Sequence, residues 1–244
     1  MVEQPKVHGA QSMISLGNEP ETLELVANSV LGLWDVVNNL TRLKPTQRER
    51  YRVTIFGSAR IPETHWVYAA VRDVAEELTR LGCDIVTGGG PGLMAAANEG
   101  TKRADPNAST RSVGIRVQLP FEQDVNAFVT QAYEHRTFFT RLHQFVLMSD
   151  AFVVMPGGIG TVLEAMMIWQ LLQVGHLNST PLILVGKMYE DLVSWCERYM
   201  LRPELRLADP EDIALPKCAQ DGPGILRLIR EHHDVWERVR KQRT

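Results

Sequence analysis

Residues 151–164 read Ala151-Phe152-Val153-Val154-Met155-Pro156-Gly157-Gly158-Ile159-Gly160-Thr161-Val162-Leu163-Glu164. An apolar run, a glycine-rich turn and the beginning of a helical pattern follow one another in this stretch. The run is apolar throughout rather than alternating, as expected of a strand that is covered on both faces. A strand, a tight turn and a helix in this order predict one βα unit of an α/β fold.

The same rhythm recurs on both sides of this stretch. We expect strands at the short apolar runs Val53–Phe56, Asp84–Thr87, Val113–Leu119, Ala151–Met155 and Pro181–Val185. We expect helices at Thr64–Leu81, Leu93–Arg103, Thr137–Met148, Thr161–Val174 and about Gly224–Val239. Strands that alternate with helices at this spacing predict right-handed crossovers and a doubly wound parallel sheet flanked by helices.

A separate helical pattern precedes this domain. Residues 1–19 read as a polar arm, Pro20 begins the pattern and Pro45 ends it. Its apolar residues form one stripe: Leu23, Val26, Ala27, Val30, Trp34 and Val37. We therefore divide the chain into an N-terminal arm and helix, residues 1–49, and a single α/β domain, residues 50–244. The stripe is expected to pack on the chain's own core or on a second copy.

Composition excludes several classes of protein. The 244 residues are 44% hydrophobic and 23% charged, which is typical of a globular chain, and the formal charge of −3 argues against a nucleic-acid binder. No apolar run is long enough to cross a membrane, and residues 1–17 lack the apolar segment of a signal peptide. Cys83, Cys196 and Cys218 lie far apart, which predicts a reducing cytoplasm and no disulfide framework. The scattered histidines predict no metal site.

Glycine-rich segments follow three of the predicted strands, and the carboxyl ends of parallel strands are where such sheets bind ligands. Glycine lets backbone N–H groups approach an anion closely, and the start of a helix adds its positive dipole. The candidate phosphate- and nucleotide-binding residues are Gly57, Ser58, Gly88, Gly89, Gly90, Gly157, Gly158, Gly160 and Thr161. For each turn taken alone, the alternative is a simple tight connection. Residues 90–95 also fit G-x-G-x-x-A, but Pro91 and the lack of an acidic residue after the next strand disfavour a dinucleotide site.

Two charged residues are expected beside these turns. Glu164 follows Thr161 by three positions, so both lie on one helix face. Glu164 either points into the pocket, toward a sugar hydroxyl or a water, or bonds back to the backbone in a capping box. Arg141 lies early on a helix that runs antiparallel to the following strand, so it reaches the same sheet edge, with Arg136 as a weaker candidate. The alternative for either arginine is a surface ion pair.

Together these motifs resemble the LOG family, the cytokinin-activating nucleoside 5′-monophosphate phosphoribohydrolases, many of which carry an older "lysine decarboxylase-like" label. The family signature P-G-G-x-G-T-x-x-E is similar to residues 156–164. The family's other glycine motifs are similar to residues 57–60 and 88–94, and the resemblance extends through residues 119–123 and 138–141.

The resemblance implies a Rossmann-like domain, usually in a homodimer or a higher assembly. It implies hydrolysis of the N-glycosidic bond of a nucleoside 5′-monophosphate, such as AMP or N6-modified AMP, to a free base and ribose 5-phosphate. The family's catalytic residues fall on Arg141 and Glu164, and we expect no cofactor. The decarboxylase label implies pyridoxal phosphate, but no lysine stands in a candidate loop.

Two departures from the family pattern bear on activity. Many relatives have lysine where this chain has Leu142, and many have an acidic residue where it has Leu163. Both changes remove charge near the expected site. They motivate an alternative function, a non-catalytic protein of the same fold that binds a nucleotide or a phosphorylated ligand.

Overall fold

The computed structural model describes residues 20, 22–24, 26–31, 49–107, 109–118 and 125–242. The chain divides into two compact units, Met1–Thr46 and Gln47–Thr244. In the first unit the described residues from Pro20 to Leu31 are helical, and Leu23, Val26 and Val30 of the predicted stripe are exposed. The rest of the predicted N-terminal helix lies outside the described residues.

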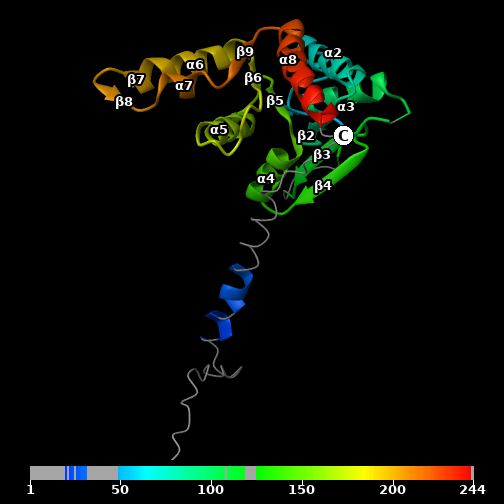
Figure 1. Cartoon of the computed structure of the whole chain (residues 1–244). Helices are drawn as coiled ribbons and strands as arrows, with labels where there is room; N and C mark the ends of the chain where they lie inside the picture. Colours follow the sequence, from blue (N-terminus) through cyan, green and yellow to red (C-terminus); the bar gives the residue numbers. More distant parts are fainter. Residues whose placement is uncertain are drawn as a thin grey trace, which may run out of the picture. The chain divides into compact units, whose positions relative to one another are not determined.

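The second unit is built on a seven-stranded sheet in which every neighbouring pair is parallel (Figure 1). The strands are β1 Arg52–Phe56, β2 Asp84–Thr87, β3 Ser112–Val117, β4 Gln131–His135, β5 Ala151–Val154, β6 Leu182–Val185 and β9 Lys217–Ala219. Their order across the sheet is β4-β3-β2-β1-β5-β6-β9. This confirms the predicted Rossmann-like, doubly wound architecture. Strands β4 and β9 were not predicted from the sequence.

Helices cover both faces of the sheet and divide the core into two clusters. On one face α2 (Trp66–Arg80), α3 (Leu93–Ala104) and α8 (Gly222–Lys241) share one cluster of buried side chains. On the other face α4 (Phe138–Met148), α5 (Ile159–Gln173) and α6 (Lys187–Met200) share the second. A small hairpin of β7 (Leu201–Arg202) and β8 (Leu205–Arg206) and the short helix α7 (Pro210–Ile213) follow α6. Among the described helices, none is long and apolar enough to span a membrane.

The central strand β1 shows why the predicted strands are apolar on both sides. Val53 and Ile55 belong to the cluster under α2, α3 and α8, whereas Phe56 belongs to the cluster under α4, α5 and α6. On that second face the Phe56 ring packs edge-on against Phe145 of α4, with 4.9 Å between the ring centroids. Side chains of a strand alternate between faces, so a strand with helices on both sides needs apolar residues at every position.

The strand order places a topological switch point at the centre of the sheet. From β1 the chain builds outward through β2, β3 and β4, and then returns to add β5, β6 and β9 on the other side of β1. The crossovers after β1 and β5 therefore leave the sheet in opposite directions and open a crevice between them. Ligands of doubly wound sheets bind in this crevice, outside the carboxyl ends of the strands.

Candidate functional site

The three predicted glycine turns meet at this switch point. The N–H of Ser58 donates to the carbonyl of Pro156 (3.2 Å), and the N–H of Leu93 donates to the carbonyl of Ser58 (2.9 Å). A Cβ on Gly57 would lie 2.9 Å from Leu93 Cβ and 3.3 Å from Met155 Cβ. The turn after β1 is therefore packed between the turns after β2 and β5, and only glycine fits there without movement of its neighbours.

The turn after β5 leads into an uncapped helix N-terminus. Gly158 is the N-cap of α5 and supplies no side-chain hydrogen bond, so Thr161 and Glu164 do not form the capping box that was the alternative for this motif. A Cβ added to Gly158 or Gly160 would meet no atom within 4 Å, so the space in front of the first turn is open. Free N–H groups and the positive end of the dipole make this turn suitable for an anion.

Arg141 and Glu164 form a largely buried ion pair beside the turns. Arg141 Nη1 lies 3.2 Å from Glu164 Oε1, and the two side chains are 13% and 11% exposed. The Nε of Arg141 donates to the carbonyl of Ile115 in β3 (2.9 Å), and its guanidinium lies over the Phe145 ring. A Cβ on Gly88 would lie 2.6 Å from Arg141 Nη2, so the turn after β2 forms one wall of the arginine site. The ion pair that Arg141 forms is thus largely buried, whereas the alternative interpretation was an ion pair on the surface.

The environment of Glu164 tunes its ionisation. Burial raises the pKa of this carboxyl to about 7, and the charge of Arg141 lowers the pKa without offsetting the burial. The carboxyl therefore titrates much nearer to neutral pH than an exposed glutamate. Burial lowers the pKa of His135, at the end of β4, and the charge of Arg141 lowers it further. A carboxyl with a pKa near 7 is suited to general acid–base chemistry.

Several residues that shape the site were not predicted from the sequence. The buried hydroxyl of Tyr189 in α6 donates to the carbonyl of Met155 (3.3 Å), directly before the β5 turn. Burial raises the pKa of Tyr189 to about 12, with the charge of Glu164 adding to the shift. Asn98 and Asn126 hydrogen-bond beneath the β2 turn. A polar residue on the buried face of the predicted helix 93–103 was a usable signal for Asn98.

The remaining predictions at this edge have mixed outcomes. Leu142 is 6% exposed and Leu163 is 51% exposed, so one departure from the family pattern is buried and the other faces outward on α5. Arg136 is exposed. Residues 119–123 lie outside the described residues. Among the residues that the structure describes, no group of three or more His, Cys, Asp or Glu side chains could hold a metal ion.

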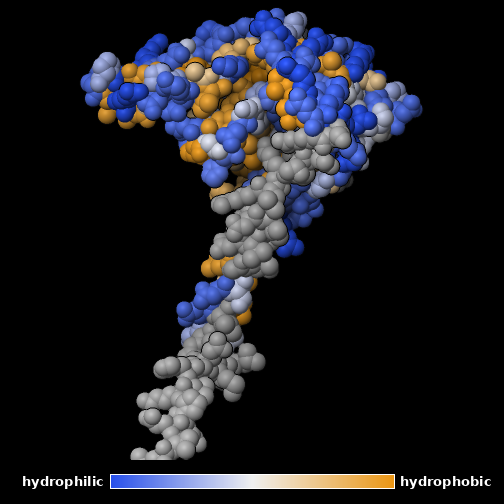
Figure 2. All heavy atoms as spheres, viewed as in Figure 1, coloured by the Kyte–Doolittle hydropathy of each residue, from blue (hydrophilic) through white to orange (hydrophobic). Residues whose placement is uncertain are grey.

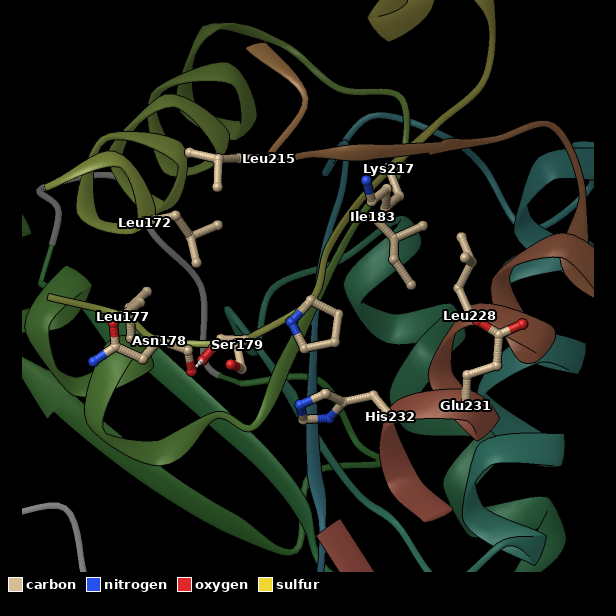
Figure 3. A pocket seen from close by; sticks show the side chains of 12 residues that line it. Leu172, Leu177, Asn178, Ser179, Ile183, Leu215, Lys217, Leu228, Glu231 and His232 are labelled. Atoms are coloured by element: carbon tan, nitrogen blue, oxygen red, sulfur yellow. Dashed lines mark hydrogen bonds between the residues drawn. The ribbon is translucent and has the colours of Figure 1, made fainter. Parts of the chain in front are cut away.

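A cavity elsewhere on the domain does not coincide with this site. It has a volume of about 560 Å³ and lies by the amino ends of β6 and β9 (Figure 3). Leu172 of α5, Lys217 of β9 and His232 of α8 line it from three sides. The Arg141–Glu164 pair lies at the carboxyl edge of the sheet instead, and it does not line this cavity.

Comparison with known proteins places the chain in a family. The family model described as "Possible lysine decarboxylase", the older label of the LOG family, matches residues 94–227, more than half of the chain. The chain belongs to the LOG family. Two curated LOG relatives come from Oryza sativa subsp. japonica. One, named probable cytokinin riboside 5′-monophosphate phosphoribohydrolase LOGL9, is 27% identical over 188 residues, which are 75% of this chain and 79% of the relative. The other, the correspondingly named LOGL3, is 29% identical over 157 residues, 62% of this chain and 72% of the relative.

Solved structures support the fold of this LOG-family chain. The molybdenum cofactor binding protein from Rippkaea orientalis superposes with a TM-score of 0.57 at 18% identity, covering 76% of this chain and 98% of that protein. The molybdenum cofactor carrier protein from Chlamydomonas reinhardtii gives a TM-score of 0.53 at 17% identity, with 76% and 99% covered. At these identities the likeness concerns the fold alone.

The site of this LOG-family chain does not fit the chemistry that the decarboxylase label suggests. Pyridoxal phosphate enzymes hold their cofactor through a lysine Schiff base. Ile115, Phe145, Glu164 and the turn at Gly88 lie beside the Arg141 guanidinium, and none of these residues is a lysine. The described part of this site therefore offers no amine to form that Schiff base.

Proposed function

We propose that this protein hydrolyses the N-glycosidic bond of a nucleoside 5′-monophosphate, AMP or an N6-modified AMP, to the free base and ribose 5-phosphate. The observation that carries the proposal is the buried pair of Arg141 and Glu164 beside an uncapped helix N-terminus at the switch point. That arrangement offers an anion site and a carboxylate next to each other. The names of the two rice relatives support the same class of substrate.

In this proposal the turns bind the 5′-phosphate and so position the ribose. The open first turn of α5, at Gly158, Gly160 and Thr161, takes the phosphate, and the turns after β1 and β2 complete the crevice. Holding the sugar in one orientation removes much of the entropic cost of reaching the transition state. The phosphate thus supplies binding energy at a distance from the bond that breaks.

The chemistry is assigned to Glu164. As the bond from C1′ to the base nitrogen breaks, C1′ gains oxocarbenium character. Ionised Glu164 stabilises this charge and accepts a proton from the attacking water, whose oxygen bonds to C1′. The base leaves with the electron pair of the broken bond and takes up a proton from solvent, and Glu164 then releases its proton to solvent, so the net reaction consumes one water. Arg141 keeps Glu164 in place and lowers the pKa of its carboxyl, so that the ionised form is available near neutral pH.

The direct test compares wild type with Glu164→Gln in an assay for adenine released from AMP. The amide keeps the shape of the side chain and can still accept from Arg141, but it cannot take a proton. Because general-base catalysis typically contributes a factor of roughly 100 or more, we expect at least that loss of turnover. AMP should still bind to the variant, because the phosphate turns are unchanged. Full turnover by the variant would refute the role of Glu164.

The second candidate is a protein that binds a phosphorylated ligand without cleaving it. The observation in its favour is that the uncapped turn of α5 needs no carboxylate to hold a phosphate. Both structural neighbours described above are named as proteins that bind or carry a cofactor. Calorimetric binding of AMP without base release, across a panel of purine and pyrimidine monophosphates, would favour this candidate over the hydrolase.

We also propose a homodimer that acts in the cytoplasm. One face of α5 presents Ile159, Leu163 and Met166, which are 88%, 51% and 37% exposed, and the surface over α5 is largely hydrophobic (Figure 2). This face begins at the phosphate turn, so a second copy packed there would border the site. Free thiols at Cys83 and Cys196 support a reducing compartment.

A further inference from the structure

A buried polar network lies beneath the second glycine turn and has no assigned role. Thr87, Asn98 and Ser112 are 0%, 0% and 1% exposed. The Thr87 hydroxyl donates to Asn98 Oδ1 (2.7 Å), and Asn98 Nδ2 donates to Ser112 Oγ (2.8 Å). Burying polar groups in a core costs free energy unless each is paired. Two side chains that pair only with each other can often be replaced by apolar groups at little cost, so a buried polar network suggests a further partner.

The network reaches the backbone of the turn from two sides. The N–H of Gly89 donates to Thr87 Oγ1 (3.0 Å). From the other side Asn126 Nδ2 lies within hydrogen-bond distance of the Gly89 carbonyl (3.1 Å), the Gly90 carbonyl (3.0 Å) and Asn98 Oδ1 (3.0 Å). The backbone N–H of Asn126 also donates to the Gly89 carbonyl (2.8 Å). The carbonyls of Gly89 and Gly90 therefore face Asn126.

These bonds fix the orientation of the turn. In a planar trans peptide the N–H points opposite to the preceding carbonyl, so the N–H of Gly90 points away from Asn126. Gly89 has a φ of +75°, which only glycine adopts readily, and a Cβ there would lie 3.2 Å from the Cα of Gly114. On its other side the turn borders Arg141, through Gly88.

We propose that Thr87, Asn98 and Asn126 form a positioning device, the turn clamp, that presets the Gly88–Gly90 turn for the anionic part of the nucleotide. The clamp holds the Gly89 and Gly90 carbonyls on the Asn126 side, away from an anion, and leaves the Gly90 N–H on the opposite side. It also holds the wall against which the Arg141 guanidinium lies. A preset turn binds its ligand without the cost of ordering the backbone. This inference rests on the proposed nucleotide site.

The test measures AMP affinity by calorimetry in variants that change one hydrogen-bonding group. Thr87→Val keeps the shape of the side chain but removes the hydroxyl, whereas Thr87→Ser retains it. Asn126→Asp keeps the side-chain oxygen that accepts from the Phe128 N–H. It replaces the amide nitrogen, which donates to the turn, with an oxygen that cannot donate when ionised. We expect Thr87→Val and Asn126→Asp each to weaken AMP binding about tenfold, as the loss of one or two hydrogen bonds implies, and Thr87→Ser to stay within about twofold of wild type.

The matched control is Ser149→Ala. Ser149 is equally buried and hydrogen-bonded, but it caps the end of α4 remote from Arg141. The Ser149→Ala variant should be less stable than wild type but should bind AMP with unchanged affinity. Wild-type affinity in Thr87→Val and Asn126→Asp would overturn the clamp. If Thr87→Val fails to fold, the AMP affinity of Asn126→Asp tests the clamp instead, because Asn126 is only half-buried and its substitution should be tolerated.

A second readout separates the clamp from the proposed function. If wild type does not bind AMP, the nucleotide site is wrong, and amide hydrogen exchange across residues 88–92 then tests the clamp alone. Faster exchange in Thr87→Val, with unchanged exchange in Ser149→Ala, supports a device that fixes the turn. Equal exchange in wild type and Thr87→Val overturns it.

Discussion

At the scale of single residues, the glycines of the β5 turn are of two kinds. A Cβ on Gly157 would lie 2.3 Å from Thr161 Oγ1 and 2.5 Å from Thr161 Cβ. A Cβ on Gly160 would meet nothing within 4 Å, and Gly160 is not among the positive-φ glycines. Gly157 is therefore required by the fold, whereas the protein alone gives no reason for glycine at position 160. The reason we propose is the phosphate.

This difference predicts opposite stability effects for two alanine substitutions. Gly160→Ala should raise the free energy of unfolding by about 0.5–1 kcal/mol, because alanine favours a helix over glycine. It should also weaken AMP binding about tenfold, because the methyl group occupies space in front of the first turn. Gly157→Ala should lower the free energy of unfolding by about 1–3 kcal/mol through overpacking. Thermal unfolding measures the change in stability, and calorimetry measures the change in AMP affinity. Unimpaired AMP binding by Gly160→Ala would show that the phosphate does not bind at this turn.

The raised pKa of Glu164 predicts the pH dependence of the proposed reaction. Since ionised Glu164 is the active form, kcat/KM should rise about tenfold per pH unit on the acid side and level off above about pH 7. The AMP phosphate also ionises near pH 6, so the informative quantity is the ratio of wild-type to Glu164→Gln activity, in which that ionisation cancels. A flat ratio between pH 5 and pH 8 would contradict the assignment.

The same ionisation is measurable without substrate. The folded state holds the Glu164 proton up to about pH 7, whereas the ordinary value is 4.5, so the folded state binds more protons over this interval. Its contribution to stability is therefore complete below about pH 4.5 and is lost as the pH rises through 7. Glu164→Gln should lack this decline in the free energy of unfolding.

At the scale of elements, the buried strands were predictable and the edge strands were not. β1, β2, β3, β5 and β6 have neighbours on both sides, nearly all of their residues are buried, and most are apolar. β4 and β9 lie at the two edges of the sheet, and Gln131–His135 of β4 alternates half-buried and exposed residues without one buried position. A half-covered edge strand leaves a weak apolar pattern, because only one of its faces meets the core.

Helix α6 was not predicted, although its sequence carries a clear apolar stripe. Tyr189 and Cys196 are buried, and Leu192, Val193 and Met200 pack against the same cluster at helical spacing, so the pattern was a usable signal. The proximity of Arg141 and Glu164 to the glycine turns followed from the direction of helices and strands. The hydrogen bond from Arg141 to the carbonyl of Ile115 could not be predicted, because every residue has a backbone carbonyl and its use as an acceptor does not depend on the type of side chain. The catalytic roles of both residues remain predictions.

At the scale of the whole molecule, the exposed apolar face of α5 predicts the state of assembly. Met166→Glu places a charge on the exposed apolar face that Met166 forms with Ile159 and Leu163. This charge should convert a dimer to a monomer in sedimentation experiments. Gln242→Glu, at an exposed position directly after α8 and away from this face, is the matched control for charge alone. A wild-type monomer at micromolar concentration would refute the dimer, and a monomeric Met166→Glu with full activity would show that the site is complete in one copy.

The backbone bond from Ser58 to Pro156 has a consequence for how the protein matures. It joins the exit of β1 to the exit of β5, so the crevice is assembled from opposite halves of the chain and is absent until both halves have docked. Such distant pairings form late in folding, because the intervening chain must first be closed into a loop. The capacity to capture a nucleotide should consequently be among the last properties that a newly made chain acquires, and among the first lost when either half loosens.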